Sequence, residues 1–278
     1  DVYKRQGRIG TVTDFSTLAG RPTKITARGF GWTHAGRTQP ALADIDLVIG
    51  PGERVLLCGD SGSGKSTFLA AIAGVLGSDE EGTRAGEILL EDFTGAVEEP
   101  GHSIPVGLVL QDPDSQVISA RVGDDIAFGC ENLAYPREEI WRRVAAAKDL
   151  VGPFVDLDFP TERLSGGQKQ RLALAGVIAM GAGVVLLDEP TANLDPAGAR
   201  DVVRAVSALV EETGATLVVV EHQHTAWEGL LDRAVELAHG RIVADGPFEQ
   251  IARRRRVEGL PQARELDDGA AGEGDAAL

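Results

Sequence analysis

Two adjacent carboxylates, Asp188 and Glu189, end an apolar run in the segment VVLLDEPTANLDP (184–196). Such a run is typical of a strand buried on both faces of a parallel sheet. There, one carboxylate can hold a metal ion while its neighbour orients or deprotonates a water molecule. An isolated Asp-Glu pair would more simply be a strand end that caps a helix. The pair therefore indicates a metal-binding and catalytic role only if a phosphate site lies beside it.

A glycine-rich segment, GDSGSGKS (59–66), could supply that phosphate site. It follows the apolar run RVLLC (54–58) and precedes KSTFLAAIAGVL (65–76), whose apolar residues recur at helical spacing. This strand–loop–helix context is the one that the P-loop pattern requires, and it disfavours a glycine-rich turn with a chance lysine. The predicted phosphate-binding residues are Gly59, Ser61, Gly62, Ser63, Gly64, Lys65, Ser66 and Thr67.

Each part of this loop has an expected role toward ATP. Backbone N–H groups and the helix N-terminus attract phosphate charge, Lys65 reaches the terminal phosphates, and the Ser66 hydroxyl ligates Mg²⁺. A P-loop fold places a second strand beside the loop, so Asp188 can hold the same Mg²⁺. Glu189 would then face the γ-phosphate and activate the attacking water.

The elements that position these residues follow from hydrophobic periodicity. Alternation over 25–49 predicts antiparallel strands, and the apolar runs at 184–188 and 216–221 predict buried parallel strands. Further strands are expected at 54–58, 86–91 and 106–111, helices at 65–76, within 124–151 and at 197–212, and a hairpin turning at 239–240. Pro136 is expected in the first turn of a helix. The predicted fold class is α/β, a P-loop NTPase with a mainly parallel core sheet, an N-terminal antiparallel β subdomain and a helical insertion.

Composition narrows the class of protein. The 278 residues carry a formal charge of −16, which argues against nucleic acid as the main partner. The two cysteines are too few for a disulfide framework and fit a reducing compartment. No apolar run approaches the length of a membrane helix, so a soluble or peripheral protein is expected.

The segment LSGGQKQR (164–171) resembles the signature motif of ATP-binding cassette (ABC) ATPases. Its residues Ser165, Gly166, Gly167 and Gln168 open a predicted helix, whose N-terminus makes a second anion site. The resemblance implies that this motif covers the γ-phosphate of ATP bound to a partner cassette, so that two cassettes enclose two ATP molecules.

The same resemblance extends to four further positions. Gln111 looks like the Q-loop glutamine, a catalytic, nucleotide-contacting and Mg²⁺-ligating residue in that family, and Asp195 lies in the D-loop motif NLDP. His222 follows the last buried strand as the switch histidine. Trp32 stands where the family has an aromatic residue that stacks on adenine, with an ordinary core or surface tryptophan as the alternative.

Within the family, QDPDSQV (111–117) followed by DDIAFGCENLAYPREEI (124–140) resembles the ATPases of energy-coupling factor importers. This implies ATP-driven uptake of a vitamin or a transition-metal ion, integral membrane partners, and a cytoplasmic, peripheral position on the inner face of the cell membrane. Glu221 replaces the threonine that many members have before the switch histidine, as in one half of tandem-fused ATPases. That departure suggests a fused second cassette.

The expected domain boundaries follow. Residues 1–6, DVYKRQ, resemble the translated end of a sequencing adapter, which would leave the true N-terminus missing, and 7–24 form a segment of unclear structure. The ABC ATPase domain spans 25–255 with its helical subdomain at about 112–180, and 256–278 form an acidic, disordered tail or linker. The run RRRR (253–256) is expected to be a solvated helix end, with contact to anionic lipid as the less favoured alternative.

Two rival functions stay open at this level. A cassette ATPase that remodels ribosomes or DNA would usually show two cassettes or a coiled-coil insertion, which this chain lacks, and the acidic charge also weighs against it. A non-catalytic regulatory cassette is disfavoured by the intact set of Lys65, Asp188, Glu189 and His222.

Overall fold

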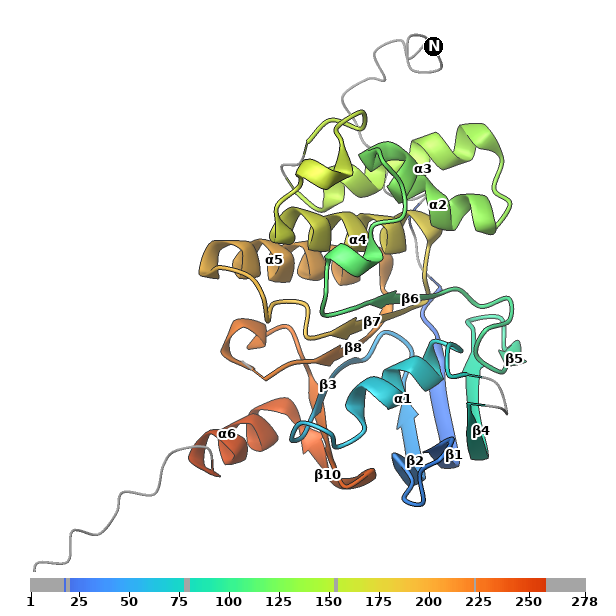
Figure 1. Ribbon diagram of the computed structural model, residues 1–278, viewed down its shortest axis with the longest axis vertical. Helices are drawn as coiled ribbons and strands as arrows, with labels where there is room; N and C mark the ends of the chain where they lie inside the picture. The colour runs from blue at the N-terminus through green and yellow to red at the C-terminus, as the bar shows by residue number, and fades with distance from the viewer. Residues whose placement is uncertain (1–17, 19–20, 78–80, 153–154, 223, 259–278) are drawn as a thin grey trace, which may run out of the picture.

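The computed structural model describes residues 18, 21–77, 81–152, 155–222 and 224–258 (Figure 1). The expectations for residues 1–6 and for the tail beyond 258 therefore lie outside the described residues. The segment from 7 to 24 is described only at residue 18 and from 21 onward. In the described part of the chain, no helix is both long and apolar enough to cross a bilayer.

Two sheets form the framework. The antiparallel sheet has the order β2-β1-β4-β5, and the larger sheet has the order β10-β9-β3-β8-β7-β6. In the larger sheet β9, β3, β8, β7 and β6 are parallel, and β10 is antiparallel to β9. The strands are β1 (Lys24–His34), β2 (Leu42–Ile49), β3 (Arg54–Cys58), β4 (Gly82–Glu91), β5 (Val97–Glu98), β6 (Val106–Val109), β7 (Val184–Asp188), β8 (Thr216–Val220), β9 (Arg233–Ala238) and β10 (Arg241–Pro247).

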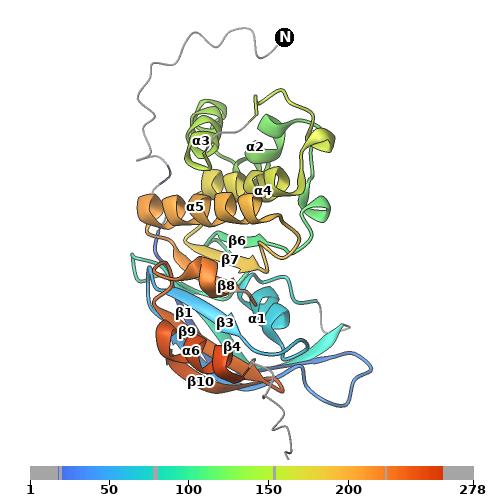
Figure 2. The ribbon, with the colours of Figure 1, turned by 90° about the vertical axis from the view of Figure 1, so that its left-hand side faces the viewer.

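Helices cover both faces of the parallel strands (Figures 1 and 2). Helices α2 to α5 lie on one face, while α1 lies on the other, toward the antiparallel sheet. Helix α6 packs against the β9–β10 hairpin. The helices are α1 (Lys65–Ile72), α2 (Val122–Asn132), α3 (Arg137–Leu150), α4 (Gly166–Met180), α5 (Pro196–Thr213) and α6 (Phe248–Glu258).

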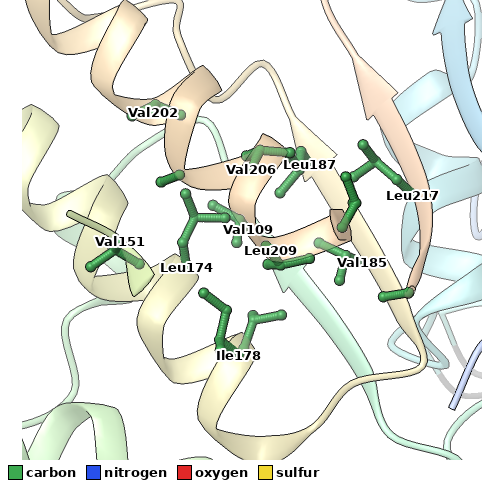
Figure 3. Packing of buried hydrophobic residues seen from close by; sticks show 14 of the residues in the cluster. Val109, Val151, Leu174, Ile178, Val185, Leu187, Val202, Val206, Leu209 and Leu217 are labelled. Atoms are coloured by element: carbon green, nitrogen blue, oxygen red, sulfur yellow. The ribbon is translucent and has the colours of Figure 1, made fainter. Parts of the chain in front are cut away.

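The parallel strands separate two hydrophobic clusters because successive side chains point to opposite faces. On β7, Val185 and Leu187 join the helical side, where they pack with Leu174 and Val206 (Figure 3). The intervening β7 residues Val184 and Leu186 join the second cluster, which also holds residues of the antiparallel sheet and α1. Burial on both faces explains the near-continuous apolar sequence of β7 and β8, as predicted.

The element boundaries differ locally from the predictions. Helix α1 ends at Ile72 rather than 76, and β6 ends at Val109 rather than 111. The helical region divides into α2 and α3, since Ala134 takes a left-handed conformation (φ 56°) between them. Pro136 is the N-cap of α3, one position before the expected first turn. Helix α6 continues through Glu258, into the segment expected to be a disordered tail.

Candidate functional site

The glycine-rich loop connects β3 to α1 in a conformation that only glycine adopts easily. Gly59, Gly62 and Gly64 have φ values of 140°, 77° and 105°. A Cβ atom on Gly59 would lie 2.1 Å from the carbonyl oxygen of Leu237, and one on Gly64 would lie 2.7 Å from that of Ala41. The loop is therefore held closely against β9 and the start of β2, and this packing fixes its backbone conformation.

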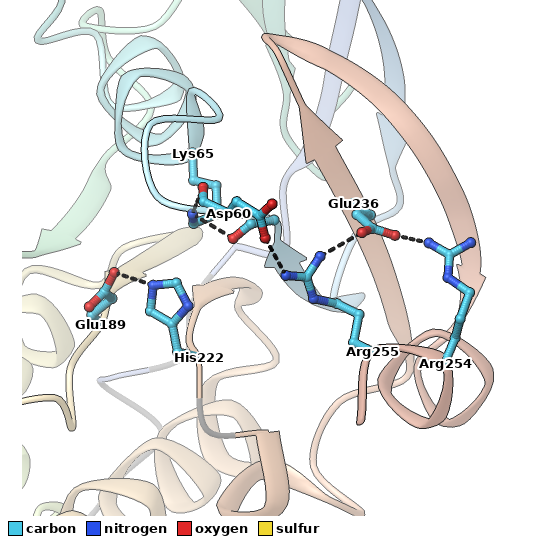
Figure 4. Close-up of polar contacts among 8 residues, drawn as sticks. Asp60, Lys65, Glu189, His222, Glu236, Arg254 and Arg255 are labelled. Atoms are coloured by element: carbon cyan, nitrogen blue, oxygen red, sulfur yellow. Dashed lines mark hydrogen bonds and ion pairs between the residues drawn. The ribbon is translucent and has the colours of Figure 1, made fainter. Parts of the chain in front are cut away.

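Lys65 begins α1 and is only 6% exposed. Its Nζ donates hydrogen bonds to the carbonyl oxygens of Gly59 at 2.9 Å and Asp60 at 2.8 Å (Figure 4). Burial lowers the pKa of Lys65, while the carboxylates of Glu189 and Asp188 raise it. The ammonium group thus lies inside the loop and within the electrostatic reach of the two carboxylates.

Two further features fit a phosphate and its metal ion. Ser63 Oγ is buried and has no hydrogen-bond partner among the described residues, as expected of a group that awaits a ligand. Asp188 forms a side-chain hydrogen bond with Ser66; burial raises the pKa of Asp188, and that hydrogen bond opposes the shift. One carboxylate and one hydroxyl suit Mg²⁺, which takes its remaining ligands from phosphates and water.

A second polar group forms around Glu189. Glu189 Oε1 lies 3.0 Å from Nε2 of His222, and Glu189 Oε2 accepts a hydrogen bond from Nε2 of Gln111 at 3.1 Å. The three residues follow β6, β7 and β8, whose carboxyl ends meet at one edge of the sheet, where ligands bind in open α/β folds. Glu189 has a left-handed backbone (φ 47°), which is uncommon for a residue with a side chain.

The predicted signature residues lie across the sheet from α1. Ser165 is the N-cap of α4: its Oγ accepts from the Gln168 amide at 3.3 Å, and its own amide donates to Gln168 Oε1 at 2.8 Å. Asp195 caps α5 through the amide of Gly198 at 2.7 Å. Gly198 also lies against Gly167, so the starts of α4 and α5 are neighbours.

The structure places Trp32 in the core. Its ring is only 4% exposed and packs against Gly82 of β4, where a Cβ atom would come within 2.3 Å of the ring. Its Nε1 donates to Nδ1 of His34 at 3.2 Å. Trp32 is therefore part of the core cluster beside the antiparallel sheet, which fits the alternative of an ordinary core tryptophan, and its stacking on adenine stays a prediction.

Two buried polar residues support the site through contacts that the sequence did not predict. Glu221 is 3% exposed; it accepts from Thr191 Oγ1 at 2.5 Å and from the His222 amide at 2.9 Å, so it ties the segment after β7 to the segment after β8. Gln170 donates to the carbonyl oxygens of Leu110 and Pro190. The sequence marks Glu221 as a departure from the family pattern and contains Gln170 within the signature motif, but it assigns neither residue a contact.

Comparisons with known proteins agree with this geometry. A family model described as ABC transporter matches residues 42–192. The energy-coupling factor transporter ATP-binding protein EcfA1 of Caldanaerobacter subterraneus is 36% identical over 241 residues, covering 83% of each protein. A putative ABC transporter ATP-binding protein of Methanosarcina acetivorans is 38% identical over 226 residues, which are 81% of this chain and 35% of that relative. The chain thus spans about a third of the length of that relative (35%).

Solved structures show the same fold. The cbiO1 protein of Clostridium perfringens, described as part of the ABC transporter complex cbiONQ, matches with a TM-score of 0.70 at 31% identity, over 84% of this chain and 92% of that one. An ATP-binding cassette bound to ADP and Pi matches with a TM-score of 0.66 at 23% identity, over 80% and 98% of the two chains, which speaks for the fold alone. The chain therefore belongs to the ABC transporter family.

Proposed function

We propose that this chain binds and hydrolyses ATP to drive an importer of the energy-coupling factor type, which takes up a vitamin or a transition-metal ion. The observation that carries the catalytic part is the convergence of Gln111, Glu189 and His222 at the sheet edge that also presents Lys65 and Asp188. The importer type is supported by relatives named as energy-coupling factor ATP-binding proteins.

In this mechanism each residue has one task. The loop amides and Lys65 bind the phosphates, and Lys65 exchanges its bonds to Gly59 and Asp60 for bonds to phosphate oxygens. Ser66 and Asp188 would hold Mg²⁺, which offsets phosphate charge when bound. Glu189 accepts the proton of the attacking water, while His222 and Gln111 fix the direction of its carboxylate.

A second cassette completes the site. The resemblance assigns Ser165, Gly166 and Gly167 to the ATP held by a partner, with Asp195 beside them. The starts of α4 and α5 support this assignment because they lie side by side and present helix N-termini. The partner is another copy, a related chain or a fused half.

We assign the membrane partner to an apolar groove between β6 and the helices α2 and α4. The groove has a volume of about 530 Å³, and the exposed side chains of Leu110, Ile118, Phe128 and Leu133 line it. The groove runs along β6 to Leu110, which directly precedes Gln111 of the catalytic group. The proposed occupant is a short cytoplasmic helix of an integral membrane subunit, whose apolar face would cover these side chains.

The first test is the Glu189→Gln variant. Loss of a general base costs about 10²–10⁴-fold in rate, so steady-state ATPase activity should fall by that factor while ATP binding persists. Size-exclusion chromatography with ATP and Mg²⁺ should show a trapped dimer when the required partner cassette is present. Normal turnover by this variant would remove Glu189 from its role.

A pull-down from solubilised host membranes tests transport. Tagged Glu189→Gln protein with ATP and Mg²⁺ should retain a multi-spanning membrane protein, identified by mass spectrometry. Phe128→Arg in the groove should abolish that retention and leave ATP binding intact; Val243→Arg, at an exposed apolar residue on β10, is the matched control. Recovery of ribosomes or DNA-bound factors in place of a membrane protein would discard transport.

A further inference from the structure

Helix α6 contacts the P-loop through the side chain of Arg255 (Figure 4). Arg255 Nη2 lies 3.0 Å from Oδ1 of Asp60, the second residue of the P-loop. Arg255 Nη1 lies 2.5 Å from Oε1 of Glu236 on β9, and Arg254 also pairs with Glu236. One guanidinium group therefore joins α6, the sheet and the nucleotide-binding loop.

The bond to Glu236 fixes the position of this guanidinium. The Glu236 side chain is only 10% exposed, and its residue pairs with Cys58 of β3 in the strand register. A carboxylate buried to that extent is costly unless it is paired. Arg255 is thus held by an enclosed anion, in contrast to a mobile surface arginine.

Asp60 places a negative charge on the P-loop. Its backbone carbonyl accepts from Lys65, while its 94% exposed carboxylate adds negative charge to a loop that is expected to bind phosphates. Like charges repel. Arg255 supplies the opposite charge beside Asp60.

We propose that Arg255 is a positioning residue of the nucleotide site, which is anchored by Glu236 and neutralises Asp60 so that this carboxylate does not repel the incoming phosphates. The inference rests on the proposed nucleotide binding and goes beyond it, because it makes α6 part of the site. It also gives two members of the run 253–256 a role inside the cassette, in place of lipid contact.

The test measures the dissociation constant of Mg²⁺ with fluorescently labelled ADP and ATP. Arg255→Ala should weaken binding by about two- to fivefold, the range of a partly exposed ion pair. In steady-state ATPase assays KM should rise and kcat should stay constant. Arg253→Ala, an exposed neighbour on α6, is the matched control and should change neither.

An Asp60→Asn background separates this role from a purely structural one. There, Arg255→Ala should have no further effect on affinity, because the charge that it neutralises is gone. High salt should shrink the effect of Arg255→Ala on the otherwise unchanged chain. Should the alanine variant unfold, Arg255→Lys is compared with the unchanged chain and with the Asp60→Asn background in the same way. It should lose less nucleotide affinity, because lysine keeps the positive charge.

Three outcomes would overturn the inference. One is unchanged affinity in folded Arg255→Ala protein, and another is an equal loss of affinity in the Asp60→Asn background. The third is a chain that binds neither nucleotide before any substitution, a result that would remove the proposed function and the inference with it. The first two leave the proposed function standing.

Discussion

Helices α1 and α4 both present an N-terminus that is expected to bind phosphate, yet the two ends are built differently. Helix α1 starts after Gly64, which has a left-handed backbone and no side-chain cap. Helix α4 starts after Ser165 with a complete capping box, in which Ser165 and Gln168 satisfy each other's amides. The first end leaves its donors for a ligand, while the second already satisfies part of its own.

This difference suggests separate roles for the two helix N-termini. The α1 end combines open amides with a buried lysine and a hydroxyl–carboxylate pair, so it can bind a nucleotide within one chain. The α4 end satisfies part of its own donors through its capping box, which suits the proposed contact with a phosphate that a partner brings. We therefore expect substitutions at α1 to change nucleotide affinity, and those at α4 to change turnover and helix stability.

The largest effect that would sharpen this comparison is on nucleotide affinity. Lys65→Ala removes a charge-assisted hydrogen bond, worth about 1.5–3 kcal/mol, so the affinity for ATP should fall by about 10- to 100-fold. Titration with a fluorescent ATP analogue measures it. An unchanged affinity would place the phosphate site away from α1.

A smaller effect is expected at the other helix end. Ser165→Ala removes the cap of α4 and should destabilise the chain by about 0.5–2 kcal/mol, measured by urea unfolding. It should lower ATPase activity while leaving the nucleotide affinity of the single chain unchanged. If that affinity fell as it does in Lys65→Ala, the two helix ends would not be divided as described.

The smallest expected effect is a pH-dependent change in the free energy of unfolding at Asp188. Burial raises the pKa of Asp188 above 3.8, so the folded chain binds this proton more readily than the unfolded chain. The ionised carboxylate therefore costs stability at neutral pH, and the cost fades as the pH falls toward 3.8. Asp188→Asn, which keeps an acceptor for Ser66, should stabilise the nucleotide-free chain most at pH 7 and less at acidic pH.

Urea unfolding of both proteins at several pH values measures this difference. Ser165→Ala serves as the reference, because its loss of stability involves no titrating group and should be independent of pH. A stabilisation by Asp188→Asn that grew at lower pH would contradict the assigned direction of the shift.

Much of the fold was predictable because burial leaves a local pattern. The parallel strands β7 and β8 are apolar on both faces, and the hairpin turns at His239 and Gly240 with φ values of 50° and 73°, as predicted. The glycine-rich loop between β3 and α1 was predictable since its glycines lie close together in the sequence. Other features depend on contacts between distant segments: the enclosure of Trp32 by β4, the bonds of Glu221, and the reach of Arg255 across 195 positions to Asp60.

The left-handed backbone of Glu189 implies a trade-off between the proposed activity and thermal stability. A glycine at that position would relieve the conformation, and glycine or asparagine is what selection for heat resistance alone would favour. Such a screen would therefore enrich chains that survive heating and lack the proposed catalytic carboxylate. A carboxylate kept at a position that suits glycine is what selection for turnover would retain, and it warns protein engineers against accepting every stabilising substitution.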